Sequence, residues 1–197
     1  MVSKNDSNEA ELFQRFLQEV IFSDNERAGI ICGAAMLDQQ LEAILKRFLI
    51  PSTSKAEEQK VFGANAPLSS FSGRITMAFR LGLIPPIVAE MLDRIRKIRN
   101  DFAHDVTVQS LDESETYKSH ITELSRVHRG AESATLDKLK LDDTPANRLR
   151  AILIAVAAML STTAKMIQPV EPLGEKVSME DLFASESSEA QDSADKT

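Results

Sequence analysis

The sequence predicts an all-α protein: a compact bundle of five to six helices, followed by a disordered acidic tail. The strong helix formers Ala, Leu, Glu, Lys, Arg, Gln and Met are abundant, whereas aromatic residues make up only 5% and Trp is absent. Apolar residues recur every three or four positions through several segments, and prolines, glycines and capping residues separate these segments. We expect one helical domain over residues 1–168 and a tail over residues 169–197.

The net charge of −7 is concentrated in the tail. Residues 169–197 contain eight acids and two lysines, which contribute −6 and leave −1 for the rest of the chain. A nearly neutral body lacks the basic surface of a general DNA-binding protein. The tail is rich in Ser, Glu, Asp and Ala, a composition that is typical of disorder. Residues 179–183 (Met-Glu-Asp-Leu-Phe) are an exception, and either dock as a short helix on a partner or stay solvated.

Two helices are expected in the first fifty residues. Residues 9–22 have the spacing of a short amphipathic helix. The S-x-x-E pattern of Ser23-Asp24-Asn25-Glu26 predicts the start of a long helix, which ends before Pro51. The single cysteine, Cys32, excludes an intramolecular disulfide and lies in an apolar run, so we expect it to be buried. The long helix carries apolar residues at helical spacing: Ala28, Ile31, Cys32, Ala35, Met36, Leu41, Ile44, Leu45 and Phe48.

The sequence predicts three further helical segments between residues 54 and 104. Ser54-Lys55-Ala56-Glu57 suits the cap of one or two turns that end near Gly63. The next helix spans residues 69–81, with Gly82 as its stop. Pro85-Pro86 then begins a helix, because proline is tolerated in a first turn. The side chains predicted to be buried are Phe71, Ile75, Ala78 and Phe79 in the former helix, and Ile87, Met91, Ile95, Ile98 and Phe102 in the latter.

The remaining segments predict two helices. Residues 105–112 are expected to form a loop and residues 113–126 a helix, whereas residues 127–143 are polar and weakly patterned. Thr144-Pro145 begins a final helix that runs to about residue 168. Residues 151–160 are apolar on nearly all sides, which favours a place at the centre of the bundle or at a dimer interface.

One heptapeptide, Arg99-Asn100-Asp101-Phe102-Ala103-His104-Asp105, carries the main candidate chemistry. Arginine can stabilise the charged transition state in which an RNA 2′-hydroxyl attacks its own phosphate, and histidine can act as acid or base. Asn100 would position the phosphate. Arg99 and His104 lie about 140° apart on a straight helix. They therefore converge only if the helix frays or turns near residues 102–104.

The same residues also have a purely structural explanation. Arg99 would pair with a carboxylate, His104 would cap the helix C-terminus, and Asp101 would pair with Lys97 one turn earlier. If the protein is a regulator and not a nuclease, the candidate residues for binding a partner are Arg96, Lys97 and Asp101.

Other kinds of site find little support in the sequence. In a helix-turn-helix over residues 78–93 the groove-facing side chains would be apolar or acidic, so we do not expect sequence-specific DNA binding by that motif. His120 and His128 lack further ligands at zinc spacing, and we expect no metal and no cofactor. No apolar run of membrane-spanning length and no signal-peptide core are evident, so we expect a cytoplasmic protein.

Several blocks in order resemble the mannitol operon repressor family. They are residues 34–42 (AAMLDQQLE), residues 67–84 (PLSSFSGRITMAFRLGLI) and residues 95–105 (IRKIRNDFAHD), and the resemblance covers about residues 20–105. It implies an all-helical, atypical transcriptional regulator that acts through protein contacts. The Arg99, Asn100 and His104 block is also similar to the motif of HEPN domains, many of which are dimeric ribonucleases. The resemblances thus leave open a non-enzymatic regulator, with a protein partner or a second copy of itself, and a metal-independent ribonuclease that binds RNA.

Overall fold

A computed structural model describes residues 18, 25–105, 110–128 and 132–172, and these ranges contain helices and no strands. The all-α class is confirmed. The helix predicted over residues 9–22 lies outside the described residues apart from residue 18, and so does the tail from residue 173 onward. The described elements are, in order, α2 (Glu26–Phe48), α3 (Lys55–Phe62), α4 (Phe71–Arg80), α5 (Pro86–His104), the short 3-10 helix η1 (Leu111–Glu113), α6 (Glu115–His128), α7 (Glu132–Leu139) and α8 (Pro145–Met166).

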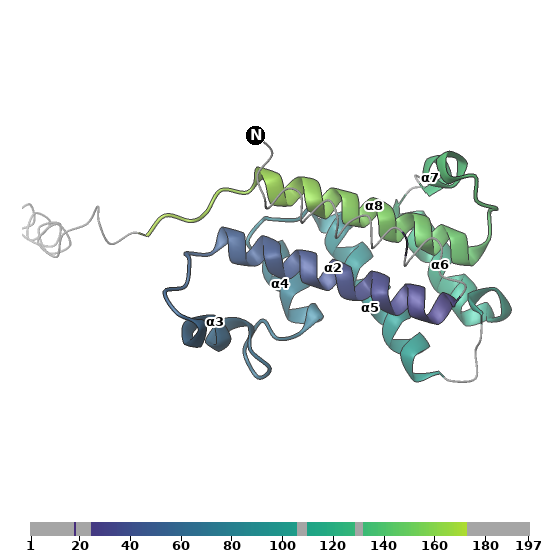
Figure 1. The fold of residues 1–197 in the computed structure, drawn as a ribbon. Coiled ribbons are helices and arrows are strands. Elements are labelled where there is room, and N and C mark those ends of the chain that lie inside the picture. Colours follow the sequence, from purple (N-terminus) through teal and green to yellow (C-terminus); the bar gives the residue numbers. More distant parts are fainter. Residues whose placement is uncertain (1–17, 19–24, 106–109, 129–131, 173–197) are drawn as a thin grey trace, which may run out of the picture.

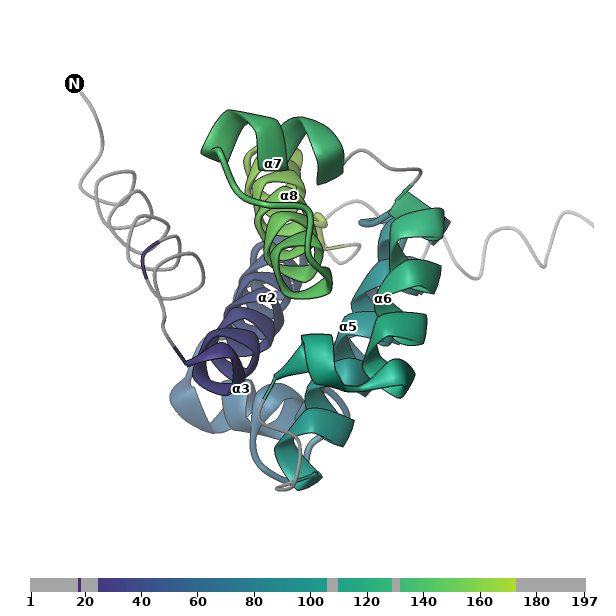
Figure 2. The same ribbon diagram turned by 90° about the vertical axis from the view of Figure 1, so that its right-hand side faces the viewer.

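Helices α2 and α8 lie side by side and run in the same direction (Figure 1). Helices α4 and α5 pack on α2, α6 bridges α5 and α8, and α7 covers part of α8 (Figure 2). The predicted central position of α8 is confirmed, because six of its residues between 151 and 160 are buried. After α8 the chain stays on the body for a few residues, since the Val170 N–H donates to the Phe48 carbonyl oxygen at 2.8 Å.

Helix α5 buries a slightly different face from the predicted one. Ile87 is 37% exposed, and Val88 takes its place in the core. The reason is that Leu92 also packs inward, which widens the buried face toward the side of Val88. The buried residues of α5 are Val88, Met91, Leu92, Ile95, Ile98 and Phe102.

Helix α2 departs from the prediction at its start. The N-cap is Asn25 rather than Ser23, and its side chain accepts a hydrogen bond from the Ala28 N–H at 3.1 Å. Cys32 is exposed, so its predicted burial was wrong. The N-terminal half of α2 is apolar on most sides, and packing selects the face with the small glycines. The residues that α2 buries are Gly29, Ile30, Gly33, Ala34, Leu37, Leu41, Ile44 and Leu45.

Helix α3 begins at its expected cap, Ser54, and α4 begins after Ser70, close to the predicted start at residue 69. The Ser54 hydroxyl accepts a hydrogen bond from the Glu57 N–H at 3.2 Å. The Glu57 carboxylate accepts in return from the Thr53 hydroxyl at 2.7 Å, which lowers the pKa of that carboxyl. In α4, Phe79 was predicted to be buried but is 42% exposed. A charged residue, Arg74, occupies the buried face instead, because two carboxylates of α2 receive it.

An additional helix, α7, lies in the segment that we expected to be irregular. The segment is weakly patterned, but it contains a buried hydrogen-bonded pair, in which His128 Nδ1 of α6 lies 2.9 Å from Glu132 Oε2. Burial raises the pKa of the Glu132 carboxyl. The hydrogen bonds from His128 and the backbone lower the pKa by more than burial raises it, so the pKa is below its usual value.

The Glu132 carboxyl should make the protein sensitive to acid. A carboxyl whose pKa is lower in the folded state contributes stability above its unfolded-state pKa, roughly 4.3, and this contribution is lost as the pH falls through the folded-state value. Urea unfolding between pH 3 and pH 7 should therefore show a loss of stability below about pH 4 that is smaller in Glu132→Gln. An identical acid dependence in the two proteins would contradict this assignment.

Helices α4 and α7 end in the same hydrogen-bond pattern with different residues. In α4 the N–H groups of Gly82 and Leu83 donate to the carbonyls of Phe79 and Ala78, and Gly82 has a φ of 71°. In α7 the N–H groups of residues 140 and 141 donate to the carbonyls of residues 137 and 136. This Schellman motif favours glycine at the left-handed position, which in α7 is Lys140 with a φ of 54°.

Replacing Lys140 with Gly should therefore stabilise the protein by about 0.5–1 kcal/mol, because a left-handed residue with a Cβ is strained. The reverse change, Gly82→Ala, should destabilise it by about 1 kcal/mol through backbone strain alone, since an added Cβ would meet no atom within 4 Å. Chemical unfolding of both variants measures the two effects. Equal stability of Lys140→Gly and the parent would show that α7 contributes little to the cooperative unfolding.

Candidate functional site

Helix α5 carries all six predicted site residues: Arg96, Lys97, Arg99, Asn100, Asp101 and His104. Arg96 and Lys97 both pair with a carboxylate on the preceding turn of the helix. Asp93 accepts from Arg96 Nη2 at 2.7 Å and pairs with Lys97 Nζ at 2.9 Å. Burial raises the pKa of the Asp93 carboxyl, but the hydrogen bonds from Lys97 and Arg96 lower it more, so that the pKa is below its usual value. The predicted Lys97–Asp101 pair is thus replaced by Lys97–Asp93.

The structure does not bring Arg99 and His104 together within one chain. Helix α5 continues through His104, so the two side chains keep the separation of about 140° that a regular helix gives. His104 is exposed, whereas Arg99 and Asn100 are half-buried. Among the described residues no carboxylate pairs with Arg99, so the predicted pair of Arg99 with a carboxylate is not observed. Convergence of Arg99 and His104 on one phosphate would need unwinding of this helix end or a second chain.

The end of α5 is held by Arg27 of α2, a residue that the sequence did not single out. Arg27 donates to the carbonyl oxygens of Phe102 and Asp105, in the latter case at 2.6 Å. Its guanidinium also lies 4.7 Å from the centroid of the Phe102 ring. These contacts satisfy carbonyls that a helix C-terminus leaves free and oppose its unwinding.

Glu26 fixes the segment that follows α5. Its carboxylate accepts from the Leu111 N–H at 2.9 Å and from the Ser110 hydroxyl at 3.2 Å. Tyr117 of α6 packs edge-on against Phe102, with ring centroids 5.2 Å apart. Burial raises the pKa of the Tyr117 phenol, and the nearby Asp105 carboxylate raises it further. Phe102 and Asp105 of the heptapeptide are therefore part of a structural junction between α2, α5 and α6.

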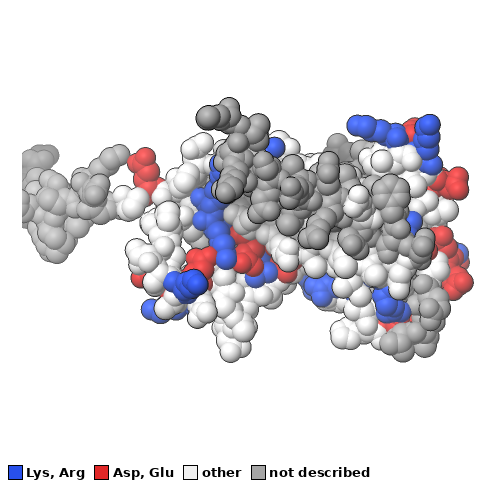
Figure 3. Space-filling view, in the orientation of Figure 1, with Lys and Arg blue, Asp and Glu red and all other residues white. Residues whose placement is uncertain are grey.

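A shallow groove of about 310 Å³ lies between α5 and α6. Its charges are largely paired, because Glu90 accepts two hydrogen bonds from Arg94 and Asp93 pairs with Lys97. The face drawn in Figure 3 shows basic and acidic side chains interspersed over most of its described part. The lining residues are Glu90, Asp93, Arg94, Lys97, Ile98 and His120.

Exposed apolar side chains follow one another along the chain where α4 ends and α5 begins, a stretch that we call the α4–α5 corner (residues 77–87). It holds four of the eight large apolar side chains that are exposed among the described residues: Met77, Phe79, Leu81 and Ile87, with exposed fractions of 36–42%. Pro85 and Pro86 are exposed beside them. A helix-turn-helix would place its groove-reading side chains here. The apolar surface suits contact with protein better than with phosphates.

The structure also bears on metal and membrane binding. Among the described residues, no group of three or more His, Cys, Asp or Glu side chains could hold a metal ion. Helices α2 and α8 are long and apolar enough to span a membrane, judged by length and composition alone. The sequence had shown no uninterrupted apolar run of that length. Core helices of soluble proteins pass the same test. These two pack on each other, so the finding is weak evidence for a membrane.

Comparison with known proteins identifies the fold. No family model matches the sequence, and no curated protein matches it. A chain of the MtlR–HPr complex from Escherichia coli has a similar structure, with a TM-score of 0.59 over 77% of this chain and 99% of that chain. The fold is mannitol-repressor-like. The sequence identity is 14%, so the similarity establishes the fold alone, and the resemblance to HEPN domains stays a prediction.

Proposed function

We propose that this protein is a non-enzymatic, cytoplasmic regulator of the mannitol operon repressor type, which acts by binding a protein partner. The observation that carries the proposal is the α4–α5 corner. Large apolar side chains are exposed there on a stable helical scaffold, and such surfaces mark contacts with other proteins. The shared fold with a chain from a complex with HPr supports the same conclusion and points to HPr, or a protein like it, as the partner.

Titration of the full-length chain with purified HPr in a calorimeter tests the proposal. We expect saturable binding that weakens by tenfold or more in Ile87→Asp and Phe79→Asp, because a charge at the centre of an apolar contact costs about 1.4 kcal/mol or more. Phe79 and Ile87 are 42% and 37% exposed and lie outside the buried core, so folding should be affected little. The matched control is Met166→Asp, since Met166 is 75% exposed at the end of α8. Equal weakening in the control would place the contact elsewhere.

The ribonuclease alternative gains no support from the geometry of a single chain, since α5 keeps Arg99 and His104 on different faces. It can be tested directly with single-stranded RNA in the presence of EDTA. We expect the RNA to stay intact. Cleavage that leaves 2′,3′-cyclic phosphate ends and is lost in both His104→Ala and Arg99→Ala would favour the ribonuclease, because each group is typically worth ~100-fold in rate. Such a result would also imply a site completed by a second copy.

A further inference from the structure

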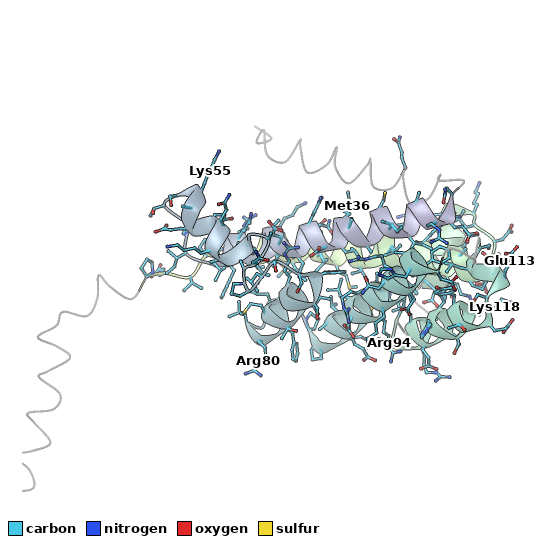
Figure 4. All side chains as sticks on the ribbon, turned by 90° about the horizontal axis from the view of Figure 1, so that it is seen from below. Met36, Lys55, Arg80, Arg94, Glu113 and Lys118 are labelled. Carbon is cyan, nitrogen blue, oxygen red and sulfur yellow. The ribbon has the colours of Figure 1, made fainter. Side chains whose placement is uncertain are left out.

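The α4–α5 corner has an unbalanced charge. Its residues, 77–87, contain no Asp or Glu and one cation, Arg80, whereas Arg74 lies earlier on α4. Arg74 is neutralised by α2, but Arg80 is exposed, and the described residues provide it with no ion pair. Figure 4 shows Arg80 at the edge of the molecule, pointing away from the helices. The corner therefore favours a ligand that combines apolar side chains with carboxylates.

One segment of this chain has that combination. Residues 179–183 read Met-Glu-Asp-Leu-Phe, with Glu180 and Asp181 between the apolar residues. The spacing i, i+3, i+4 of Met179, Leu182 and Phe183 places all three on one face of a helix. The segment could thus present an apolar face and two carboxylates to the same surface.

The segment can reach the corner from where the chain leaves the body. Val170 is attached to Phe48 at the end of α2, and α4 meets α2 through Arg74 and Glu42. Six residues of helix separate Phe48 from Glu42 and another six separate Arg74 from Arg80, each about 9 Å of rise, and neighbouring helix axes lie about 8–10 Å apart. The corner is then within about 30 Å of Phe48, whereas twelve residues from Val170 to Leu182 extend to about 40 Å.

The basic residues among positions 94–99 of α5 should attract this acidic segment more weakly than Arg80 does. Arg94 is paired with Glu90, and both Arg96 and Lys97 are paired with Asp93. An incoming carboxylate would have to displace those existing pairs. Arg99 has no carboxylate partner among the described residues, but it is half-buried, whereas Arg80 is exposed. At Arg80 no such displacement is needed.

We propose that residues 179–183 bind the α4–α5 corner, with their apolar face on Phe79, Leu81 and Ile87 and their carboxylates toward Arg80. The segment then masks the surface from a protein partner until the partner displaces it. This regulatory role rests on the proposed function, because masking matters only if a partner uses the corner. The contact itself can be measured without any partner.

A labelled peptide of residues 176–187 tests the contact. We expect it to bind the full-length double variant Leu182→Ser, Phe183→Ser about tenfold more tightly than the parent protein. In the parent the tethered segment competes at an effective concentration in the mM range. Fluorescence anisotropy measures both affinities. No binding to the double variant, or equal affinity for the two proteins, would overturn the proposal.

Charge reversal locates the contact. In the background of the double variant, Arg80→Glu should weaken peptide binding about fivefold at low salt, and a peptide with Glu180→Lys and Asp181→Lys should recover most of that loss. The matched control Arg94→Glu should change the affinity by less than about twofold. A loss in Arg94→Glu without a loss in Arg80→Glu would move the segment to α5 and overturn the proposed site.

Titration with HPr separates this inference from the proposed function. We expect HPr to bind the double variant about threefold or more tightly than the parent, because its surface is no longer masked. Equal affinity of HPr for both proteins would overturn masking while leaving the proposed function intact. If HPr binds neither protein, the proposed partner is wrong, and the peptide measurements still decide the contact.

Discussion

Replacing Ile98 with Asp should remove about 4 kcal/mol or more from the free energy of unfolding, which is exceptional for one substitution. Ile98 is 1% exposed in the buried face of α5. An aspartate there would lose the apolar contacts and bring in a carboxylate with no partner in the apolar core. For a domain of this size the midpoint of thermal unfolding should fall by about 10 °C or more. Calorimetry or thermal circular dichroism measures the shift.

The matched control for this change is Ile87→Asp on the same helix. The sequence placed Ile87 and Ile98 in one stripe, but Ile87 is 37% exposed. Its replacement should alter stability by about 0.5 kcal/mol or less, as surface substitutions usually do. If the two variants melt alike, the buried face of α5 has been assigned incorrectly.

Arg74→Ala should give the second largest loss of stability, about 3 kcal/mol. Arg74 Nη1 lies 2.7 Å from Asp38 Oδ1, and Nη2 lies 2.5 Å from Glu42 Oε2. The arginine side chain is 9% exposed and the two carboxylates are about one quarter exposed, so its removal leaves two partly buried charges without their counterion. The interface of α2 with α4 should loosen first, which hydrogen exchange of α4 would detect.

The exposed pair Arg94–Glu90 provides the comparison for Arg74. Both are arginine–glutamate contacts of short distance, but Glu90 is 51% exposed and solvent screens the pair. We expect Arg94→Ala to cost about 0.5 kcal/mol or less. An Arg74→Ala variant as stable as Arg94→Ala would show that the buried pair gives no net stability. The buried Nε of Arg74, which has no hydrogen-bond partner, already reduces the stability that the pair can contribute. If Arg74→Ala does lose stability, its recovery in Arg74→Met would identify packing, rather than charge, as the dominant contribution.

Local signals in the sequence predicted much of the fold. The predicted caps Ser54 and Thr144 act as N-caps, and their side chains accept hydrogen bonds from N–H groups of the first turn; Ser70 does the same for α4. Such caps depend on neighbouring residues only, so the sequence contains all the information that they need. The apolar period of α5 from Met91 to Phe102 was likewise readable, because one helix face determines it.

The tertiary structure decided the features that depend on distant residues. Helix α7 forms around the buried His128–Glu132 pair, although its sequence is weakly patterned. Cys32 is exposed because α2 is apolar on most sides and its neighbours choose which face to cover. Phe79 remains outside because Arg74 finds its two carboxylates on α2.

The candidate site shows the same division. The sequence by itself determined the all-α class, the caps Ser54 and Thr144, and the grouping of Arg96, Lys97, Arg99, Asn100, Asp101 and His104 on one helix end. It could not reveal that Arg27, 75 residues before Phe102, donates to the end of that helix. Nor could it reveal that the apolar residues near Pro85 stay exposed. Capping and periodicity act within a few residues, whereas burial and long-range hydrogen bonds exist only once the helices have packed.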